Sequence, residues 1–161
     1  LKRDLADAAT LAGAVSAMTT LNAAAARAML AVGVHAATDV TGFGLLGHLH
    51  SLLRASGVGA TLDSARIPVL AGARELLARG AVPGGTKRNL ESVRDAVRFA
   101  ANIPEGERLL LADAQTSGGL LLVLPPERVE RLQLALAREG LPAAPVIGSV
   151  TAGAAGTIDV R

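Results

Sequence analysis

The chain has 161 residues, of which 50% are hydrophobic, 19% charged and 1% aromatic, and its formal net charge is +2 at pH 7. This composition is typical of a soluble domain with an aliphatic core, and a chain of this length needs no disulfide or metal to fold. Cysteine is absent, which excludes disulfides, thiolate zinc sites and a cysteine nucleophile within these residues; cytoplasm is the default compartment. With two phenylalanines and no tryptophan or tyrosine, the chain offers no base-stacking platform, and we expect neither nucleic acid nor membrane as a partner.

The first half of the chain predicts helices that alternate with short strands. Apolar residues recur every three or four positions from Val15 to Val32, which predicts one long amphipathic helix ended by Gly33. The elements expected next are a strand, a helix closed by Gly57 and a second strand, over 34–38, 45–53 and 58–62.

The second half begins with a helix over 70–79 that Gly80 stops, followed by turn residues over 81–86. Interleaved charges over 91–98 predict a solvated helix face, on which Glu91 faces Arg94 and Asp95 faces Arg98. The remaining elements are a buried strand, a helix stopped by Gly140 and two last strands, over 120–124, 125–136, 146–150 and 157–160. This order predicts an α+β fold in which a mixed β-sheet is packed with helices.

The first glycine-rich segment, 39–47, lies at a strand-to-helix junction. Its glycines satisfy G-x-G-x-x-G, and Asp63 follows at the spacing of a dinucleotide fingerprint, but the preceding strand is too polar for a buried first strand of that fold. A helix N-terminus with glycines does favour an anion, and Asp39 beside a phosphate is reasonable only with a divalent cation between them. One aspartate cannot hold magnesium alone. The other interpretation is that Asp39 caps a helix or turn.

Two further glycine-rich segments leave their roles open. In 80–89 the lysine comes one place too late for a P-loop, so the segment is a loop whose Lys87 and Arg88 either approach an anionic ligand or are solvated. Segment 113–119 precedes the most hydrophobic strand and is either a site floor or a turn. His48 and His50 are two apart on a helix, which excludes a shared metal, and we interpret them as structural or surface residues.

Taken together and in this order, the three segments resemble the signature blocks of the C-terminal half of the selenophosphate synthetases (selenide, water dikinases). The blocks are the residues 39–48, 80–89 and 113–121. The resemblance extends over nearly the whole chain, and Ala114 stands where that family usually has proline. Enzymes of the related aminoimidazole ribonucleotide synthetase superfamily share the fold, so the resemblance implies the fold of that superfamily's C-terminal domain.

The resemblance implies that residues 1–161 are a single C-terminal domain and that the N-terminal ATP-binding domain is absent from this chain. The implied reaction converts selenide, ATP and water to selenophosphate, AMP and phosphate, with Mg²⁺ on the triphosphate. The reactive cysteine or selenocysteine and most metal-binding aspartates belong to the other half, so we expect this chain alone to be inactive. The implied partners are the N-terminal domain, ATP, selenide and a second copy in a homodimer.

Carried over by position, Asp39 becomes a magnesium ligand, while Thr41 and Gly42 line the phosphate site. The further cofactor-binding candidates are Thr116, Ser117, Gly118 and Gly119. Two alternatives remain: a superfamily ATP enzyme that acts on another small-molecule acceptor, and a non-catalytic docking or dimerisation module.

Overall fold

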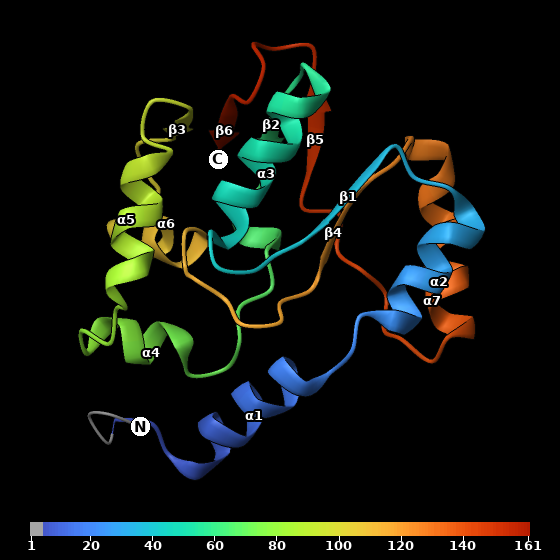
Figure 1. The fold of residues 1–161 in the computed structure, drawn as a ribbon. Coiled ribbons are helices and arrows are strands. Elements are labelled where there is room, and N and C mark those ends of the chain that lie inside the picture. The colour runs from blue at the N-terminus through green and yellow to red at the C-terminus, as the bar shows by residue number, and fades with distance from the viewer. Residues whose placement is uncertain (1–4) are drawn as a thin grey trace.

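The computed structural model describes residues 5–161 and confirms the expected α+β fold, in which helices pack on a mixed sheet (Figure 1). The helices are α1 (Ala8–Thr19), α2 (Ala23–Val32), α3 (Gly44–Ser56), α4 (Ala73–Ala78), α5 (Gly84–Ser92), α6 (Glu105–Leu111) and α7 (Val129–Arg138), with short 3₁₀ turns η1 (Ser64–Arg66) and η2 (Pro126–Arg128). The strands are β1 (Ala36–Asp39), β2 (Gly59–Leu62), β3 (Val97–Phe99), β4 (Leu120–Val123), β5 (Gly148–Thr151) and β6 (Ile158–Val160).

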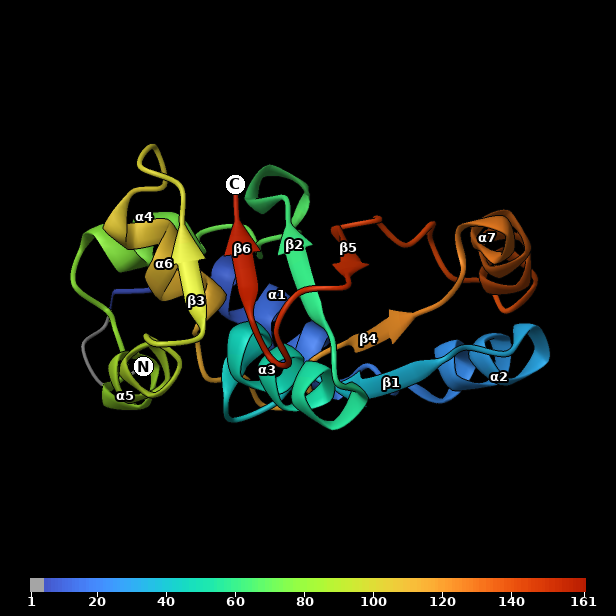
Figure 2. The ribbon, with the colours of Figure 1, turned by 90° about the horizontal axis from the view of Figure 1, so that it is seen from above.

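The larger sheet has the strand order β3-β6-β2-β5, in which β6 is parallel to both neighbours and β5 is antiparallel to β2 (Figure 2). The side chains that alternate onto one face are buried against the leucines of α3: Ala60, Leu62, Ile158 and Val160. On β3 and β6, Arg98 and Asp159 face each other in register, and their ion pair, 2.6 Å long, is exposed. The hydrogen bonds from Arg98 hold the pKa of Asp159 below its usual range.

A two-stranded ribbon connects this sheet to a second, smaller core. β1 and β4 are antiparallel, from Ala36 opposite Val123 to Asp39 opposite Leu120. Beyond one end of the ribbon, α2 and α7 pack against each other, away from the four-stranded sheet (Figure 1). Their buried side chains are Ala28, Val32, Leu132 and Leu136. The ribbon therefore spans the distance between two apolar clusters.

The expectation of one helix over 15–32 is wrong, because the chain breaks between α1 and α2. Thr20 is extended, and its hydroxyl donates 2.7 Å to the carbonyl oxygen of Ser16, which competes with continued helix. Asn22 does not cap α2; its amide donates 2.8 Å to the carbonyl oxygen of Gly118, 96 residues away. A contact between residues so far apart in the sequence cannot be predicted from the spacing of apolar residues.

The charged helix expected over 91–98 is wrong in its second half. The Glu91–Arg94 ion pair forms as expected, but Arg98, the partner expected for Asp95, lies on β3 and pairs across the sheet. Three residues are too few for a periodic signal, and β3 is stabilised by its parallel neighbour β6. Helix α6, which follows β3, was also absent from the expected order.

Smaller differences concern the ends of elements and the burial of one strand. The turn expected over 81–86 runs into α5, which begins at Gly84, and β4 is half-buried rather than fully buried. The glycine stops are confirmed by positive φ at Gly57, Gly80 and Gly140. Within residues 5–161, no single helix is long and apolar enough to cross a membrane; α1 and α2 reach that length only together, with a bend of 48° between them.

Candidate functional site

Asp39 is the last residue of β1 and its side chain is exposed. Within residues 5–161 the carboxylate accepts no hydrogen bond and forms no ion pair, and α3 has no side-chain cap. The interpretation of Asp39 as a capping residue is therefore wrong. Because β1 alternates, Ala37 and Asp39 lie on one face of the ribbon, while Ala36 and Thr38 lie on the half-buried face. The strand thus presents one unpaired carboxylate at its end.

The turn that follows Asp39 is held by its backbone. The carbonyl oxygen of Thr41 accepts from the amides of Gly44 at 2.9 Å and Gln115 at 3.0 Å. Gly44 has a φ of +67°, and a Cβ atom there would lie 2.6 Å from the carbonyl carbon of Ala112, so only glycine fits. Gly42 is exposed, and a Cβ atom there would meet nothing within 4 Å. The two glycines differ: Gly44 serves packing, and Gly42 leaves open space beside the turn.

His48 of α3 contacts this turn, and sequence reasoning missed that contact. Its Nε2 atom lies 3.1 Å from the hydroxyl oxygen of Thr41, and its ring is tilted against Phe43 at a centroid distance of 5.6 Å. Helical side chains lean toward the N-terminus, so a residue one turn into α3 reaches back to the strand end. His50 instead contacts the carbonyl oxygen of Gly156 through Nδ1 at 2.9 Å. The two histidines therefore contact different parts of the chain, as positions two apart on a helix do.

The third block lies directly beside the end of β1. The amide of Val40 donates 2.9 Å to the carbonyl oxygen of Gly119, and a Cβ atom on Gly118 would lie 2.1 Å from the carbonyl oxygen of Val40. Ser117 has a φ of +51°, a rare conformation for a residue with a side chain. Thr116 and Ser117 are exposed, and within the described residues their side chains make no hydrogen bond. The structure brings Gly118 and Gly119 to Val40 and leaves two hydroxyls facing outward.

The second block joins the other two through side chains that the sequence did not single out. Thr86 is 1% exposed, and its hydroxyl donates 2.5 Å to Oδ1 of Asp113. The amide of Asn89 donates to the carbonyl oxygens of Gly42 at 2.8 Å and Ala112 at 3.1 Å. Lys87 and Arg88, the two cations that the sequence offered for an anionic ligand, are exposed. The block therefore acts through its hydroxyl and amide groups.

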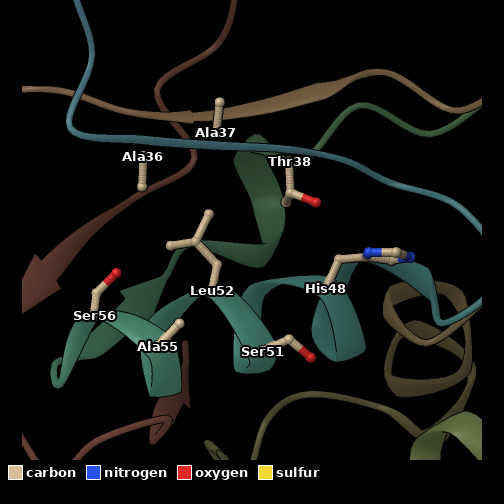
Figure 3. Close-up of a pocket in the computed structure, with 8 residues that line it drawn as sticks. All are labelled: Ala36, Ala37, Thr38, His48, Ser51, Leu52, Ala55 and Ser56. Carbon is tan, nitrogen blue, oxygen red and sulfur yellow. The ribbon is translucent and has the colours of Figure 1, made fainter.

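A pocket of about 360 Å³ lies between β1 and α3. Figure 3 shows Ala36 and Thr38 on the side of the strand that faces the helix, with His48 at one end of the pocket. The other lining residues are Ala37, Ser51, Leu52, Ala55 and Ser56. Among residues 5–161, no lysine or arginine lines the pocket, so these residues supply no cation there that would balance a phosphate. The lining of this pocket therefore gives no support to an anionic ligand there.

Within residues 5–161 there is no group of three or more His, Asp or Glu side chains that could hold a metal ion. Asp39 supplies one hard oxygen donor, which suits magnesium, but magnesium binds an octahedral set of ligands that is usually completed by water, substrate phosphates and further carboxylates. The carboxylate of Asp39 is thus a suitable ligand for magnesium. Because it is a single ligand, a magnesium site here needs further ligands from outside the described residues.

The chain matches, over residues 1–161, the family described as AIR synthase related protein, C-terminal domain. The selenide, water dikinase of Myxococcus xanthus is 47% identical over 163 residues, which cover 99% of this chain and 46% of that protein. The selenide, water dikinase of Porphyromonas gingivalis is 48% identical over 86% of this chain and 39% of its own length, and that of Carboxydothermus hydrogenoformans is 43% identical over 94% and 43%. The chain thus spans less than half the length of these curated relatives.

The crystal structure of the hydrogenase maturation protein HypE superposes on this chain with a TM-score of 0.56 at 18% identity, covering 88% of this chain and 39% of that one. At this identity the likeness shows the fold alone. The resemblance to the selenophosphate synthetases that the three blocks indicated is confirmed by the curated relatives.

Proposed function

Because the chain belongs to the family of AIR synthase related proteins, C-terminal domain, we propose that it is the C-terminal domain of an ATP-dependent selenophosphate synthetase. The reaction would convert selenide, ATP and water to selenophosphate, AMP and phosphate. The observation that carries the proposal is the 47% identity to a selenide, water dikinase over 99% of the chain. The contacts among the three sequence blocks around Asp39 support it.

In this proposal Asp39 is the metal-binding carboxylate among the residues that the structure describes. Magnesium, when bound, would neutralise phosphate oxygens while a phosphoryl group is transferred. Asp39 would fix the position of the ion, since its carboxylate is exposed and has no partner in the described residues. Thr41 and Gly42 would line the phosphates, Gly42 because the space beside it is open.

The weaker part of the site is the turn over 116–119. Thr116 and Ser117 would offer hydroxyls, because both are exposed and make no other hydrogen bond within the described chain. Gly118 and Gly119 would act through their backbone, which already holds Val40 in place.

The remaining parts of the enzyme would be supplied by the half that this chain does not include. That half would bind ATP and carry the cysteine or selenocysteine and the further metal ligands, and the complete protein would be a cytoplasmic homodimer. The chain alone would then have no selenide-dependent turnover, because its described residues form no group of three or more His, Asp or Glu side chains that could hold the metal.

The test is an assay of the complete protein that contains this chain, incubated with ATP and Mg²⁺ with and without selenide under anaerobic conditions. The expected result is AMP and phosphate formation that requires selenide, and a selenophosphate signal in the phosphorus NMR spectrum. ATP hydrolysis stimulated by another acceptor and not by selenide would favour a different superfamily enzyme. A complete protein that neither binds nor hydrolyses ATP would favour a docking or dimerisation module.

A further inference from the structure

Helix α1 is uncharged, and it has no buried residue. Ala8–Thr19 contains no Asp, Glu, Lys or Arg, and Val15 and Met18 are 45% and 41% exposed. Leu21, just beyond the helix, is 81% exposed. A helix on a solvated surface normally carries charges opposite its apolar stripe, and a helix without them is normally covered. The surface formed by Val15, Met18 and Leu21, called the α1 face below, therefore has the character of an interface.

Helix α1 has no buried residue, and the contacts that tie this part of the chain to the rest include two near the N-terminal end of the helix. Thr10 lies close to Gly72, where a Cβ atom would come within 2.9 Å of its side chain. Arg79 donates 2.7 Å to the carbonyl oxygen of Leu5. Figure 1 shows α1 extended beneath the body of the molecule. Val15, Met18 and Leu21 nevertheless stay exposed among the described residues.

The C-terminal end of α1 leads directly to the candidate site. Asn22 follows Leu21, and its amide donates to the carbonyl oxygen of Gly118. Gly118 in turn touches Val40, the residue after Asp39. Whatever covers the α1 face is thereby brought to the edge of the site, where the described residues form no group of three or more His, Asp or Glu side chains that could hold a metal ion.

We propose that the α1 face is the docking surface for the other half of the same protein, which would present an apolar, uncharged surface to it. This inference rests on the two-part organisation in the proposed function. The chain accounts for 46% of the length of its relative from Myxococcus xanthus, so more than half of that protein is available to cover it. The docked half closes over the end of β1.

The size of the α1 face favours a covalently linked partner over a second copy. A helix of 12 residues is about 18 Å long and about 10 Å wide, a footprint of roughly 200 Å². A stable dimer buries about 800 Å² on each partner. A linked half needs less contact, because the effective concentration within one chain reaches the millimolar range.

Cysteine labelling tests the proposal, because the chain contains no cysteine of its own. The complete protein is prepared as Val15→Cys, as Met18→Cys and as the control Leu134→Cys; Leu134 is 56% exposed on α7, outside the α1 face. Each protein reacts with N-ethylmaleimide, and peptide mass spectrometry measures the rate at the substituted position alone. We expect positions 15 and 18 to react at least about tenfold more slowly than position 134 in the native protein and equally fast in urea.

Equal native rates at positions 15 and 134 would overturn the proposal. Protection that disappears on dilution to monomers would assign the α1 face to a second copy, and protection that appears only with phospholipid vesicles would assign it to lipid; either result also overturns it. Turnover is measured separately on the same samples. Protection of position 15 without selenide-dependent turnover would support the docking surface and refute the proposed function. Selenide-dependent turnover without protection of position 15 would support the proposed function and refute the docking surface.

Discussion

The side-chain amide of Asn89 donates 2.8 Å to the carbonyl oxygen of Gly42, so helix α5 holds the turn that follows Asp39. The same amide reaches the carbonyl oxygen of Ala112 at 3.1 Å, at the C-terminal end of α6. One side chain thus connects the turn between β1 and α3 to two further helices, and the position of Gly42 depends on it.

Asn89→Ala in the complete protein should lower the free energy of unfolding by about 1–2 kcal/mol, because two carbonyl oxygens lose their donor. Selenide-dependent AMP formation should fall as well, since Gly42 is no longer held. Urea unfolding and the AMP assay measure the two effects. Lys87→Ala is the matched control, an exposed position on the same helix where we expect a change within about 0.5 kcal/mol. Equal behaviour of the two variants would show that the amide does not hold the turn.

Asp39→Asn in the complete protein should reduce selenide-dependent turnover at least about 100-fold, since the neutral amide no longer fixes a cation. The unfolding free energy should stay within about 0.5 kcal/mol of the parent, because the carboxylate has no partner in the described residues. Turnover is followed by AMP release and stability by urea. Asp95→Asn, whose side chain is 93% exposed, serves as control and should leave both unchanged. Near-normal turnover of Asp39→Asn would remove the metal role.

Gly118→Ala should destabilise the protein by about 1–3 kcal/mol, because the new Cβ would lie 2.1 Å from the carbonyl oxygen of Val40 and the backbone must move. Gly119→Ala is the natural comparison: a Cβ there meets nothing within 4 Å, and its φ is not positive. Thermal unfolding of both variants measures the difference. If the two substitutions lowered the melting temperature equally, the close contact between Gly118 and Val40 would be wrong.

The ion pair between Arg74 and Glu107 should make stability depend on pH. Arg74 donates to both carboxylate oxygens, at 2.7 and 3.0 Å, and this holds the pKa of Glu107 below its usual range. A carboxyl whose folded pKa is lowered contributes stability above its unfolded pKa, about 4.3, and loses that contribution as the pH falls through its folded value. Arg74 is 53% exposed, so solvent screening limits the contribution to about 0.5 kcal/mol.

Glu107→Gln should therefore be slightly less stable than the parent at pH 7, and the difference should vanish in acid, once the pH has fallen through the lowered folded pKa of Glu107. Glu105→Gln is the control, because Glu105 lies in the same first turn of α6 but is exposed and has no ion pair within the described residues. Urea unfolding at both pH values gives the comparison. A difference that persists in acid would assign the effect to packing instead of charge.

The sequence predicted those parts of the fold that local chemistry decides. The helix over 45–53 and its stop at Gly57 are confirmed, because a leucine stripe and a glycine in the left-handed region are local features. The break at Thr20 was missed because it depends on a hydroxyl that competes with the helix. Strand β3 was missed because its partner, β6, lies 61 residues further along the chain.

The candidate site was predicted only in part, because local sequence features identify some of its residues and contacts between distant elements decide the others. Asp39 at a strand end and the glycine turns were found from residue type and order. The roles of Thr86, Asn89 and His48 were not, because each depends on a contact with another element that spacing along the chain does not encode. Lys87, whose charge made it a candidate in the sequence, is exposed in the structure.

The ribbon of β1 and β4 has one end at each apolar cluster, and the clusters differ in size. Among the described residues, the cluster beside α3 has fourteen buried members and the one between α2 and α7 has four. Amide protons of α2 and α7 should therefore exchange with solvent through openings that need less free energy than those of α3. Val40, next to Asp39, belongs to the larger cluster. Thermal fluctuations are thus concentrated at the end of the ribbon far from the carboxylate, which keeps its place while the opposite end opens.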